Sequence, residues 1–337
     1  MRHRDLLHLI HVPESRLSEV VPGVFELALP IPFENGWVNS FLLRGEGHVD
    51  LIDCGMNSPD SVELLRGALE EVGGRGAGVR RLVVTHIHPD HYGAAGLLTK
   101  DGAELYLHRL EVPMVSPRYV DIDALVADVG RHLELHGVPE ADAEEMRNAS
   151  RAMRDFVTPA SVAVQLDGAE TLDVGPRPLR VEWTPGHSPG HVCLWDAEER
   201  VLFAGDQLLP EMSPNIGLHP QSTPNPLDEY LAALDHLLEL EPRLVLPAHG
   251  QPFADAAQRV AAMHAHHSRR KDQIEEIVAG ETMTGWEVSI AVFGRRQHLY
   301  ERRLALQEAL AHLQSLAVEG RVEKLTAATA VSWRRPR

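Results

Sequence analysis

The segment THIHPDHYG, residues 85–93, places three histidines and an aspartate within six consecutive positions. These residues, His86, His88, Asp90 and His91, form the pattern H-x-H-x-D-H. Imidazole and carboxylate groups are the protein ligands of zinc, iron and manganese. On a turn, four such side chains can diverge toward two neighbouring centres. Histidine clusters also occur on solvated surfaces, so residues elsewhere in the chain must decide between the two interpretations.

Three more ligand-type residues each follow a segment with the composition of a strand. They are His187 in TPGHSPGH, Asp206 in FAGD and His249 in LPAHG. In α/β folds, loops at the carboxyl ends of strands gather the binding residues, and the neighbouring Gly and Pro residues restrict the backbone. A satisfied polar loop residue would explain each of them singly. All of them together with the first cluster predict a metal site.

The elements that must position these residues alternate between strands and helices. We expect strands over residues 23–29, 37–44, 48–53, 80–85, 104–108, 161–166, 179–184, 192–196, 200–206 and 243–250. Ser58 as N-cap, Pro59 as first residue and Gly73 with Gly74 as the stop predict a helix. Further helices are expected from Ala94 and over 227–240. Residues 119–155 read as a helical insertion, and the pattern is mainly helical from about residue 254.

The ligand set resembles that of the metallo-β-lactamase superfamily, with Asp53 matching the early aspartate of that family. The resemblance covers roughly residues 20–255. It implies an α/β fold, a four-layer αβ/βα sandwich with the metals at one rim. It also implies how the ligands are shared: one metal takes His86, His88 and His187, the other takes Asp90, His91 and His249, Asp206 bridges them, and Asp53 orients ligands from behind.

The C-terminal sequence is similar to the winged-helix-like domain of the branch that contains β-lactamase-like protein 2. The similarity lies in HHSRRKDQIEEIV, TGWEVSIAVFG and ERRLALQEALAHLQSLAVEGRVEK. We therefore predict an N-terminal arm (1–20), a metal-binding domain (21–255) and a smaller, mainly helical domain (256–337). The loop QLLPEMSPNIGLHP after Asp206 departs from the ribonucleases of that branch.

The charge distribution argues against a polyanionic substrate. The net charge is −17, and residues 259–337 hold 13 Lys/Arg against 9 Asp/Glu, which leaves residues 1–258 at −21. Phosphate binding draws on clustered Lys and Arg, so RNA is the less favoured partner. Cys54 and Cys193 are expected to be buried free thiols. The first residues do not resemble a signal peptide and no segment could span a bilayer, so we expect a cytoplasmic protein without a membrane partner.

The resemblance implies two divalent metal ions, zinc first, with iron or manganese as alternatives. A bridging hydroxide would attack a small carbonyl substrate: an ester, thioester, lactone or lactam. Asp90 would serve both as ligand and as proton acceptor. Two alternatives remain open: a phosphodiesterase or endoribonuclease acting on single-stranded RNA or nucleotides, and a non-catalytic, metal-binding regulatory protein. A homodimer is also left open.

Substrate choice must come from residues around the metals. The insertion carries Met146, Met153 and Phe156, which either cap the metal rim or pack on the sandwich. Loop 207–220 is expected to form the other wall, where His219 or Asn215 could donate to an oxyanion. The histidines at positions 264, 266 and 267 are interpreted as a solvated helix face.

Overall fold

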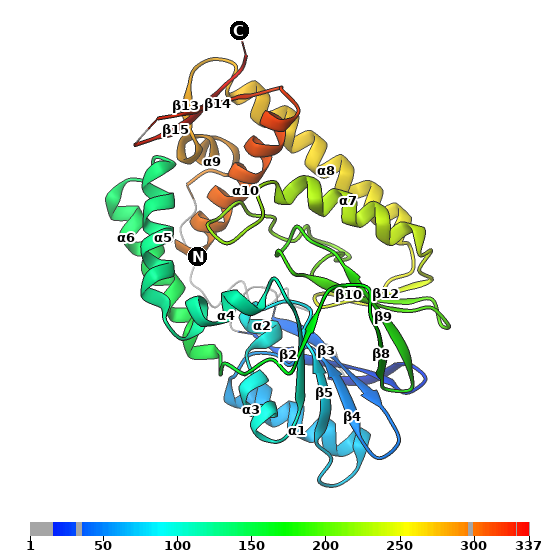
Figure 1. Cartoon of the computed structure of the whole chain (residues 1–337). Helices are drawn as coiled ribbons and strands as arrows, with labels where there is room; N and C mark the ends of the chain where they lie inside the picture. The colour runs from blue at the N-terminus through cyan, green and yellow to red at the C-terminus, as the bar shows by residue number, and fades with distance from the viewer. Residues whose placement is uncertain (1–15, 32–35, 296–298, 328, 337) are drawn as a thin grey trace, which may run out of the picture.

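The computed structural model describes residues 16–31, 36–295, 299–327 and 329–336. Two β-sheets face each other, with helices on their outer sides and a further helical part beyond one end (Figure 1). The first sheet has the order β1-β2-β3-β4-β5-β6-β7 and the second the order β12-β11-β10-β9-β8. Most of the predicted N-terminal arm lies outside the described residues. Its last part, from Leu17, forms the edge strand β1.

The strands of the first sheet are β1 (Leu17–Val21), β2 (Val24–Pro30), β3 (Trp37–Arg44), β4 (Val49–Ile52), β5 (Val79–Val83), β6 (Glu104–His108) and β7 (Val164–Leu166). Those of the second are β8 (Thr171–Val174), β9 (Arg177–Trp183), β10 (Val192–Asp196), β11 (Val201–Gly205) and β12 (Leu244–Pro247). Strands β4 to β7 pair in parallel, as do β11 and β12, and the other neighbours are antiparallel. The predicted strands are confirmed with small shifts at their ends, whereas β1 and β8 were missed.

The two sheets are held together by a buried apolar layer. Phe41 of β3 meets Phe203 of β11 edge to face, with ring centroids 5.3 Å apart, and Val83 and Leu246 belong to the same cluster. Helices α1 (Pro59–Gly73) and α3 (Ala95–Lys100) cover the outer face of the first sheet. Helices α7 (Pro226–Glu239) and α8 (Ala256–Ile277) cover that of the second. The predicted four-layer αβ/βα sandwich is therefore confirmed.

Local signals explain where the first helix starts and stops. The Ser58 hydroxyl accepts a hydrogen bond from the backbone N–H of Ser61, Pro59 occupies the first turn, and Gly74 caps the end with a positive φ of 90°. Because α1 buries Leu65 and Leu69 against the sheet, its amphipathic pattern matches its place in the fold.

The predicted insertion, residues 119–155, forms α5 (Ile122–Leu135), α6 (Glu140–Met153) and most of a short 3-10 turn, Arg154–Phe156; helix α4 (Val112–Tyr119) precedes it. The main core of α5 and α6 is shared with the C-terminal helices, whereas Met114 and Val115 of α4 pack in the cluster of the first sheet. Leu133 and Met146 pack in one cluster with Leu306 and Leu310, and Trp333 completes it. The insertion and the C-terminal part therefore bury their apolar faces against each other (Figure 1).

The C-terminal part consists of the end of α8, β13 (Met283–Thr284), α9 (Gly285–Phe293), α10 (Leu299–Val318), β14 (Glu323–Thr326) and β15 (Val331–Arg334). Its strands form a small sheet in the order β13-β15-β14. Helix α8 packs Val260 on the second sheet and Ile274 in the C-terminal cluster, so it belongs to both parts. The winged-helix character and the domain limits stay predictions. In the described part of the chain, no helix combines the length and apolarity that a membrane crossing requires.

Candidate metal centre

All seven predicted ligands lie at one rim of the sandwich, after the carboxyl ends of four strands. His86 and His88 follow β5, and the short helix α2 (Pro89–Tyr92) carries Asp90 and His91. Strands β9, β11 and β12 run in one direction and lead to His187, Asp206 and His249. The Val192 N–H donates to the Thr85 carbonyl at 3.0 Å, and this bond joins the two sheets at the rim.

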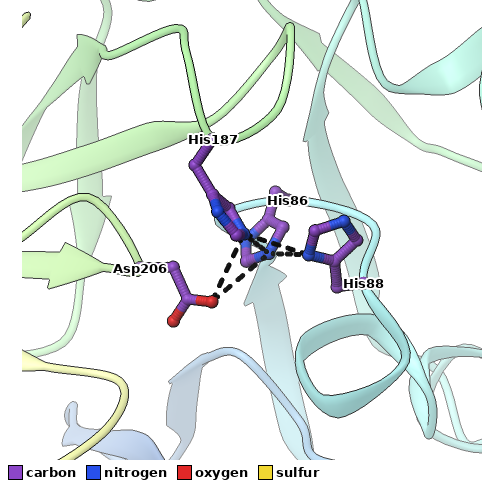
Figure 2. Close-up of side chains that lie close together, drawn as sticks. All are labelled: His86, His88, His187 and Asp206. Carbon is purple, nitrogen blue, oxygen red and sulfur yellow. Dashed lines mark hydrogen bonds and ion pairs between the residues drawn. The ribbon is translucent and has the colours of Figure 1, made fainter. Parts of the chain in front are cut away.

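The first group consists of His86, His88, His187 and Asp206 (Figure 2). The Nε2 atom of His86 lies 2.8 Å from Nδ1 of His88, and Nε2 of His187 lies 3.2 Å and 3.0 Å from these two atoms. Asp206 Oδ2 is 3.3 Å from His187 Nε2. Three ring nitrogens and one carboxylate oxygen thus face a single point.

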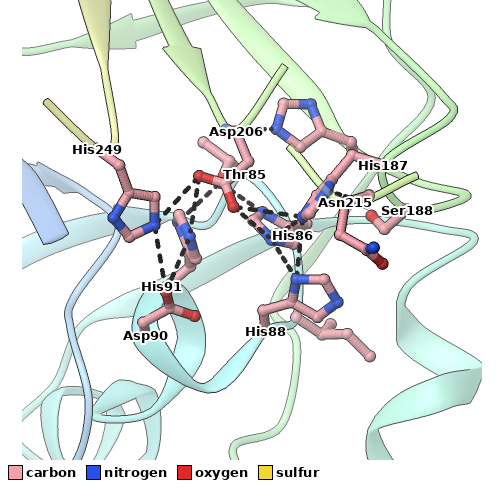
Figure 3. Close-up of polar contacts among 12 residues, drawn as sticks. Thr85, His86, His88, Asp90, His91, His187, Ser188, Asp206, Asn215 and His249 are labelled. Atoms are coloured by element: carbon pink, nitrogen blue, oxygen red, sulfur yellow. Dashed lines mark hydrogen bonds and ion pairs between the residues drawn. The ribbon is translucent and has the colours of Figure 1, made fainter. Parts of the chain in front are cut away.

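The second group consists of Asp90, His91 and His249 (Figure 3). Asp90 Oδ2 lies 3.3 Å from Nε2 of His249 and 3.7 Å from Nε2 of His91. The other oxygen of Asp206, Oδ1, lies 3.5 Å from His91 Nε2 and 3.4 Å from His249 Nε2. Asp206 therefore offers one oxygen to each group, which is the arrangement of a bridging carboxylate.

The orientation of three imidazole rings is fixed by oxygen atoms that lie near Nδ1, on the side of each ring away from the site. Asp53 Oδ2 lies 2.8 Å from Nδ1 of His91. The carbonyl of Asn215 lies 3.1 Å from Nδ1 of His187, and that of Trp37 lies 3.0 Å from Nδ1 of His249. A ring that donates from Nδ1 presents the lone pair of Nε2 to the site.

Asp53 is held firmly in this role. The backbone N–H of Thr85 donates to its Oδ1 at 2.8 Å, and the Thr85 hydroxyl also contacts the carboxylate. The Asp53 backbone has a φ of 57°, a left-handed conformation that is unusual for an L-residue with a side chain. Asp53 thus lies behind the His91 ring, and its role in orienting a ligand stays a prediction.

The electrostatics of the site suit cations. Burial lowers the pKa of His86 and His88 well below the usual range, which keeps both rings in the neutral form that binds metals. Burial disfavours the ionised form of Asp206, but the neighbouring His249 and His91 hold the pKa of its carboxyl well below its ordinary value. Within the described residues, buried His91 Nε2 and Asp206 Oδ1 have no hydrogen-bond partner. These donor atoms fit one divalent cation in each group.

Glu111 is a buried residue that the sequence analysis missed. Its Oε1 accepts hydrogen bonds from the Ser188 hydroxyl at 2.8 Å and the Gly190 N–H at 2.7 Å, and its Oε2 accepts one from the Ile87 N–H at 3.1 Å. Ile87 lies between two ligands and Ser188 follows a third. Glu111 therefore ties the two ligand loops together.

His191 was also missed, although it stands in the same TPGHSPGH segment as His187. It is fully buried, and its Nε2 accepts a hydrogen bond from the backbone N–H of Asp206 at 3.1 Å. Its Nδ1 lies 2.8 Å from the Thr184 hydroxyl. His191 supports the backbone of Asp206 and does not belong to either ligand group.

A cavity of about 400 Å³ opens onto both ligand groups. Its walls come from the insertion, from loop 207–220 and from helix α10. Of the residues considered for capping the rim, Met153 lines this cavity, whereas Met146 is in the C-terminal core and Phe156 packs on the first sheet's cluster. A volume of this size is typical of sites for small molecules.

Asn215 and His219 both line the cavity. The Asn215 side-chain amide donates to the Leu304 carbonyl at 3.3 Å, so one of its donors is engaged. His219 Nδ1 accepts a hydrogen bond from the Gln221 N–H at 3.2 Å. Burial and the charge of Arg118 lower the pKa of His219 well below the usual range, so the neutral ring carries its proton on Nε2.

The expectation of a solvated histidine face on α8 is wrong for His267. This residue is almost fully buried, with Nδ1 3.1 Å from Nε2 of His312 and Nε2 3.4 Å from the Ser213 hydroxyl. It links α8 and α10 to the cavity wall. The sequence analysis is correct for both cysteines, which are buried and free.

A two-sheet sandwich with histidines and aspartates gathered at one rim defines a metallohydrolase of the αβ/βα class. Residues 36–249 match the family model of the metallo-beta-lactamase superfamily. The chain belongs to this superfamily. The match includes every one of the seven ligand candidates.

Three curated proteins are similar in sequence to this chain. The "Probable metallo-hydrolase YqjP" of Bacillus subtilis is 26% identical over 307 residues, 88% of this chain and 92% of the relative. The "Acyl-coenzyme A thioesterase MBLAC2" of Gallus gallus is 30% identical over 231 residues, 66% and 76% of the two chains. The "Beta-lactamase-like protein 2 homolog" of Caenorhabditis elegans is 24% identical over 317 residues, 94% and 90%.

Among solved structures, a metallo-beta-lactamase family protein from Thermus thermophilus superposes with a TM-score of 0.84. It is 34% identical in sequence, and the match covers 94% of this chain and all of the other. The similarity thus extends beyond the sandwich into the C-terminal part. Together the comparisons identify the chain as a hydrolase of the metallo-β-lactamase fold.

Proposed function

We propose that this protein hydrolyses a small carbonyl substrate, with thioesters and esters first, using two divalent cations of which zinc is the leading candidate. The observation that carries the proposal is the Asp206 carboxylate, which directs one oxygen to each ligand group at the floor of a small cavity. The name of the thioesterase relative supports acyl transfer to water.

In this proposal His86, His88 and His187 would hold one cation and Asp90, His91 and His249 the other, with Asp206 offering Oδ2 to the first group and Oδ1 to the second. Cations held there would supply a water of lowered pKa and polarisation of the carbonyl group. No serine or cysteine nucleophile is then needed.

The chain's own residues contribute proton transfer and orientation. Asp90 Oδ2 lies near His249, whereas Oδ1 has no hydrogen bond among the described residues, and the side chain lines the cavity. Oδ1 is therefore available to accept the proton of the attacking water. The Nε2–H of His219 is a donor for the oxygen of the substrate, and the apolar side chains of Met153 and Leu209 limit the access of bulk water.

The proposal is tested by metal analysis together with one substrate panel on the metal-loaded protein. The panel contains a thioester, an aryl ester, a lactone, a cephalosporin, bis-p-nitrophenyl phosphate and a short single-stranded RNA. We expect about two divalent ions per chain and turnover of the carbonyl compounds. His88→Ala should lower kcat/KM by at least about a hundredfold, because removing a ligand costs no less than disturbing its supports.

His264→Ala is the matched control, because His264 is an exposed histidine paired with Asp235, and it should behave like the unchanged protein. Turnover limited to the phosphodiester and RNA would replace the proposal with the nuclease alternative. Bound metal without turnover of any member of the panel would support the regulatory alternative.

A further inference from the structure

Arg118 lies where the insertion meets the ligand loop. It is on α4 and lines the cavity together with His88, Asp90 and His187. The next residue, Tyr119, donates its hydroxyl hydrogen to the carbonyl of Ile87, between two of the ligands. Helix α4 is therefore anchored on the ligand loop, and this anchor holds the Arg118 guanidinium beside the first ligand group.

The guanidinium of Arg118 forms no ion pair with a described residue, and the carboxyl group on which its charge acts, that of Glu111, is already bound by the Ser188, Gly190 and Ile87 donors. The Arg118 Nε donates to the neutral Oε1 of Gln221 at 2.8 Å, and among the described residues no carboxylate lies within ion-pair distance. Other arginines of this acidic chain are paired, such as Arg177 with Asp196 at 2.7 Å and Arg302 with Asp142 at 2.6 Å. Although the sequence holds 49 Asp and Glu residues, none of those described forms an ion pair with Arg118 at the cavity.

The surroundings of Arg118 favour a bound anion. Gln221 and His219 are neutral, and Arg303 of α10 lines the same cavity from the opposite part of the chain. The wall beside them is apolar, with Ile122 and Leu125 of α5. A partly desolvated cation gains most from a charged partner, and the planar guanidinium matches the two oxygens of a carboxylate or phosphate.

We propose that Arg118 forms an anion subsite of the substrate cavity, so that the preferred substrates are acyl compounds that carry a carboxylate or phosphate close to the scissile carbonyl. This inference rests on the proposed hydrolytic function and narrows its substrate class. Neither the family match nor the ligand geometry assigns such a subsite.

The test uses three thioesters with the same acetyl group on metal-loaded protein. They are S-acetyl-3-mercaptopropanoate, S-acetyl-2-mercaptoethyl phosphate and the neutral S-acetyl-3-mercaptopropanamide. We expect kcat/KM for the better of the two anions to exceed that for the amide by about 10- to 100-fold, mostly through KM, since a charge-assisted contact contributes this much. The better anion identifies the carboxylate or the phosphate as the natural group.

Arg118→Gln should remove this preference and leave kcat/KM for the neutral amide within about twofold, because the amide makes no charged contact. Arg118→Lys should restore part of the preference. Arg109→Gln is the matched control, because Arg109 pairs with Asp167 at the surface, outside the cavity. An equal loss on all three substrates would assign Arg118 a purely structural role and overturn the inference. So would an unchanged preference in Arg118→Gln.

A binding measurement separates this inference from the proposed function. If no thioester is hydrolysed, the hydrolase proposal fails, and 3-(methylthio)propanoate and its amide are then titrated by calorimetry. Tighter binding of the carboxylate that is lost in Arg118→Gln would support the subsite without any turnover. Equal binding of both compounds to both proteins would overturn it.

Discussion

The two loops that carry His88 and His187 meet at one carboxylate, that of Glu111. Burial raises the pKa of Glu111, while hydrogen bonds from Gly190, Ile87 and Ser188 act in the opposite direction. A side chain that receives three hydrogen bonds in a buried position fixes its partners closely. We therefore regard Glu111 as a positioning residue for both loops.

Replacing Glu111 by Gln tests this role. The amide keeps the size of the side chain but turns one acceptor oxygen into a donor that faces an N–H group. We expect a loss of about 1–3 kcal/mol in the free energy of unfolding of the metal-free protein. Metal affinity should fall by about 10- to 100-fold. Chelator competition measures the affinity, and thermal unfolding of the metal-free form measures the stability.

Glu104→Gln provides the comparison, because Glu104 is exposed on β6, a few residues before Glu111. It should change neither quantity. Unchanged metal affinity in Glu111→Gln would show that the ligand loops hold their geometry without this carboxylate.

At the level of single elements, strand β2 contains an acidic side chain, Glu26, whose ionised form is disfavoured by burial. Glu26 is buried in β2, between β1 and β3, and its Oε2 has no hydrogen-bond partner among the described residues. Burial raises the pKa of Glu26 to about 7. The folded protein thus holds a proton that the unfolded chain releases near its ordinary value of 4.5.

The stability should therefore depend on pH through Glu26. Between about pH 4.5 and pH 7 the folded state binds more protons at this group, so its contribution to stability is present at low pH and is lost as the pH rises through 7. Over this range the stability of Glu26→Gln relative to the unchanged protein should rise by up to about 3 kcal/mol. Urea unfolding of both proteins at pH 4.5, 6 and 8 measures the difference.

The comparison of the two proteins cancels the titration of the metal-site residues, which they share. A difference that is constant across the three pH values would mean that folding does not shift the pKa of Glu26. In that case the carboxylate must be reached by water.

At the scale of the whole molecule, the cavity depends on two parts of the chain that share one core. Helix α10 supplies Leu304 and Arg303 to the cavity, and α5 supplies Ile122 and Leu125. Arg302 of α10 also pairs with Asp142 of α6 at 2.6 Å. The insertion and the C-terminal helices therefore act as one wall.

A substitution that leaves a void in this shared core should destabilise α5, α6 and α10 together. Leu310 is fully buried in the cluster that joins α5, α6 and α10. Leu310→Ala should lower the free energy of unfolding by about 2–5 kcal/mol. Hydrogen exchange should speed up in α5 and α6 as well as in α10, because these helices lose packing together.

Val318→Ala on the same helix is the control, since Val318 is 62% exposed and should change stability by no more than about 0.5 kcal/mol. Faster exchange confined to α10 after Leu310→Ala would show that the insertion is stable without the C-terminal helices.

Much of the fold was predictable because its signals are local. The cap at Ser58 and Pro59 and the β-branched strand before Thr85 depend on neighbours in the sequence, and the structure confirms both elements. The strand at residues 171–174 was missed because TLDV has only four residues, so its pairing with β9 is what defines it. Glu111 was missed for a similar reason: a lone acidic residue before a helix has no pattern, and its burial follows from packing.

The sequence by itself determined the seven candidate ligands and the family fold, because each ligand sits beside strand ends and glycine or proline residues that restrict the local backbone. Only the tertiary structure decided what surrounds them. The joint core of insertion and C-terminal helices, the position of Arg118 in the cavity and the carboxylate of Glu111 between two loops all arise from contacts between distant segments. Such contacts follow from the burial of surfaces against each other, and no local pattern encodes their partners.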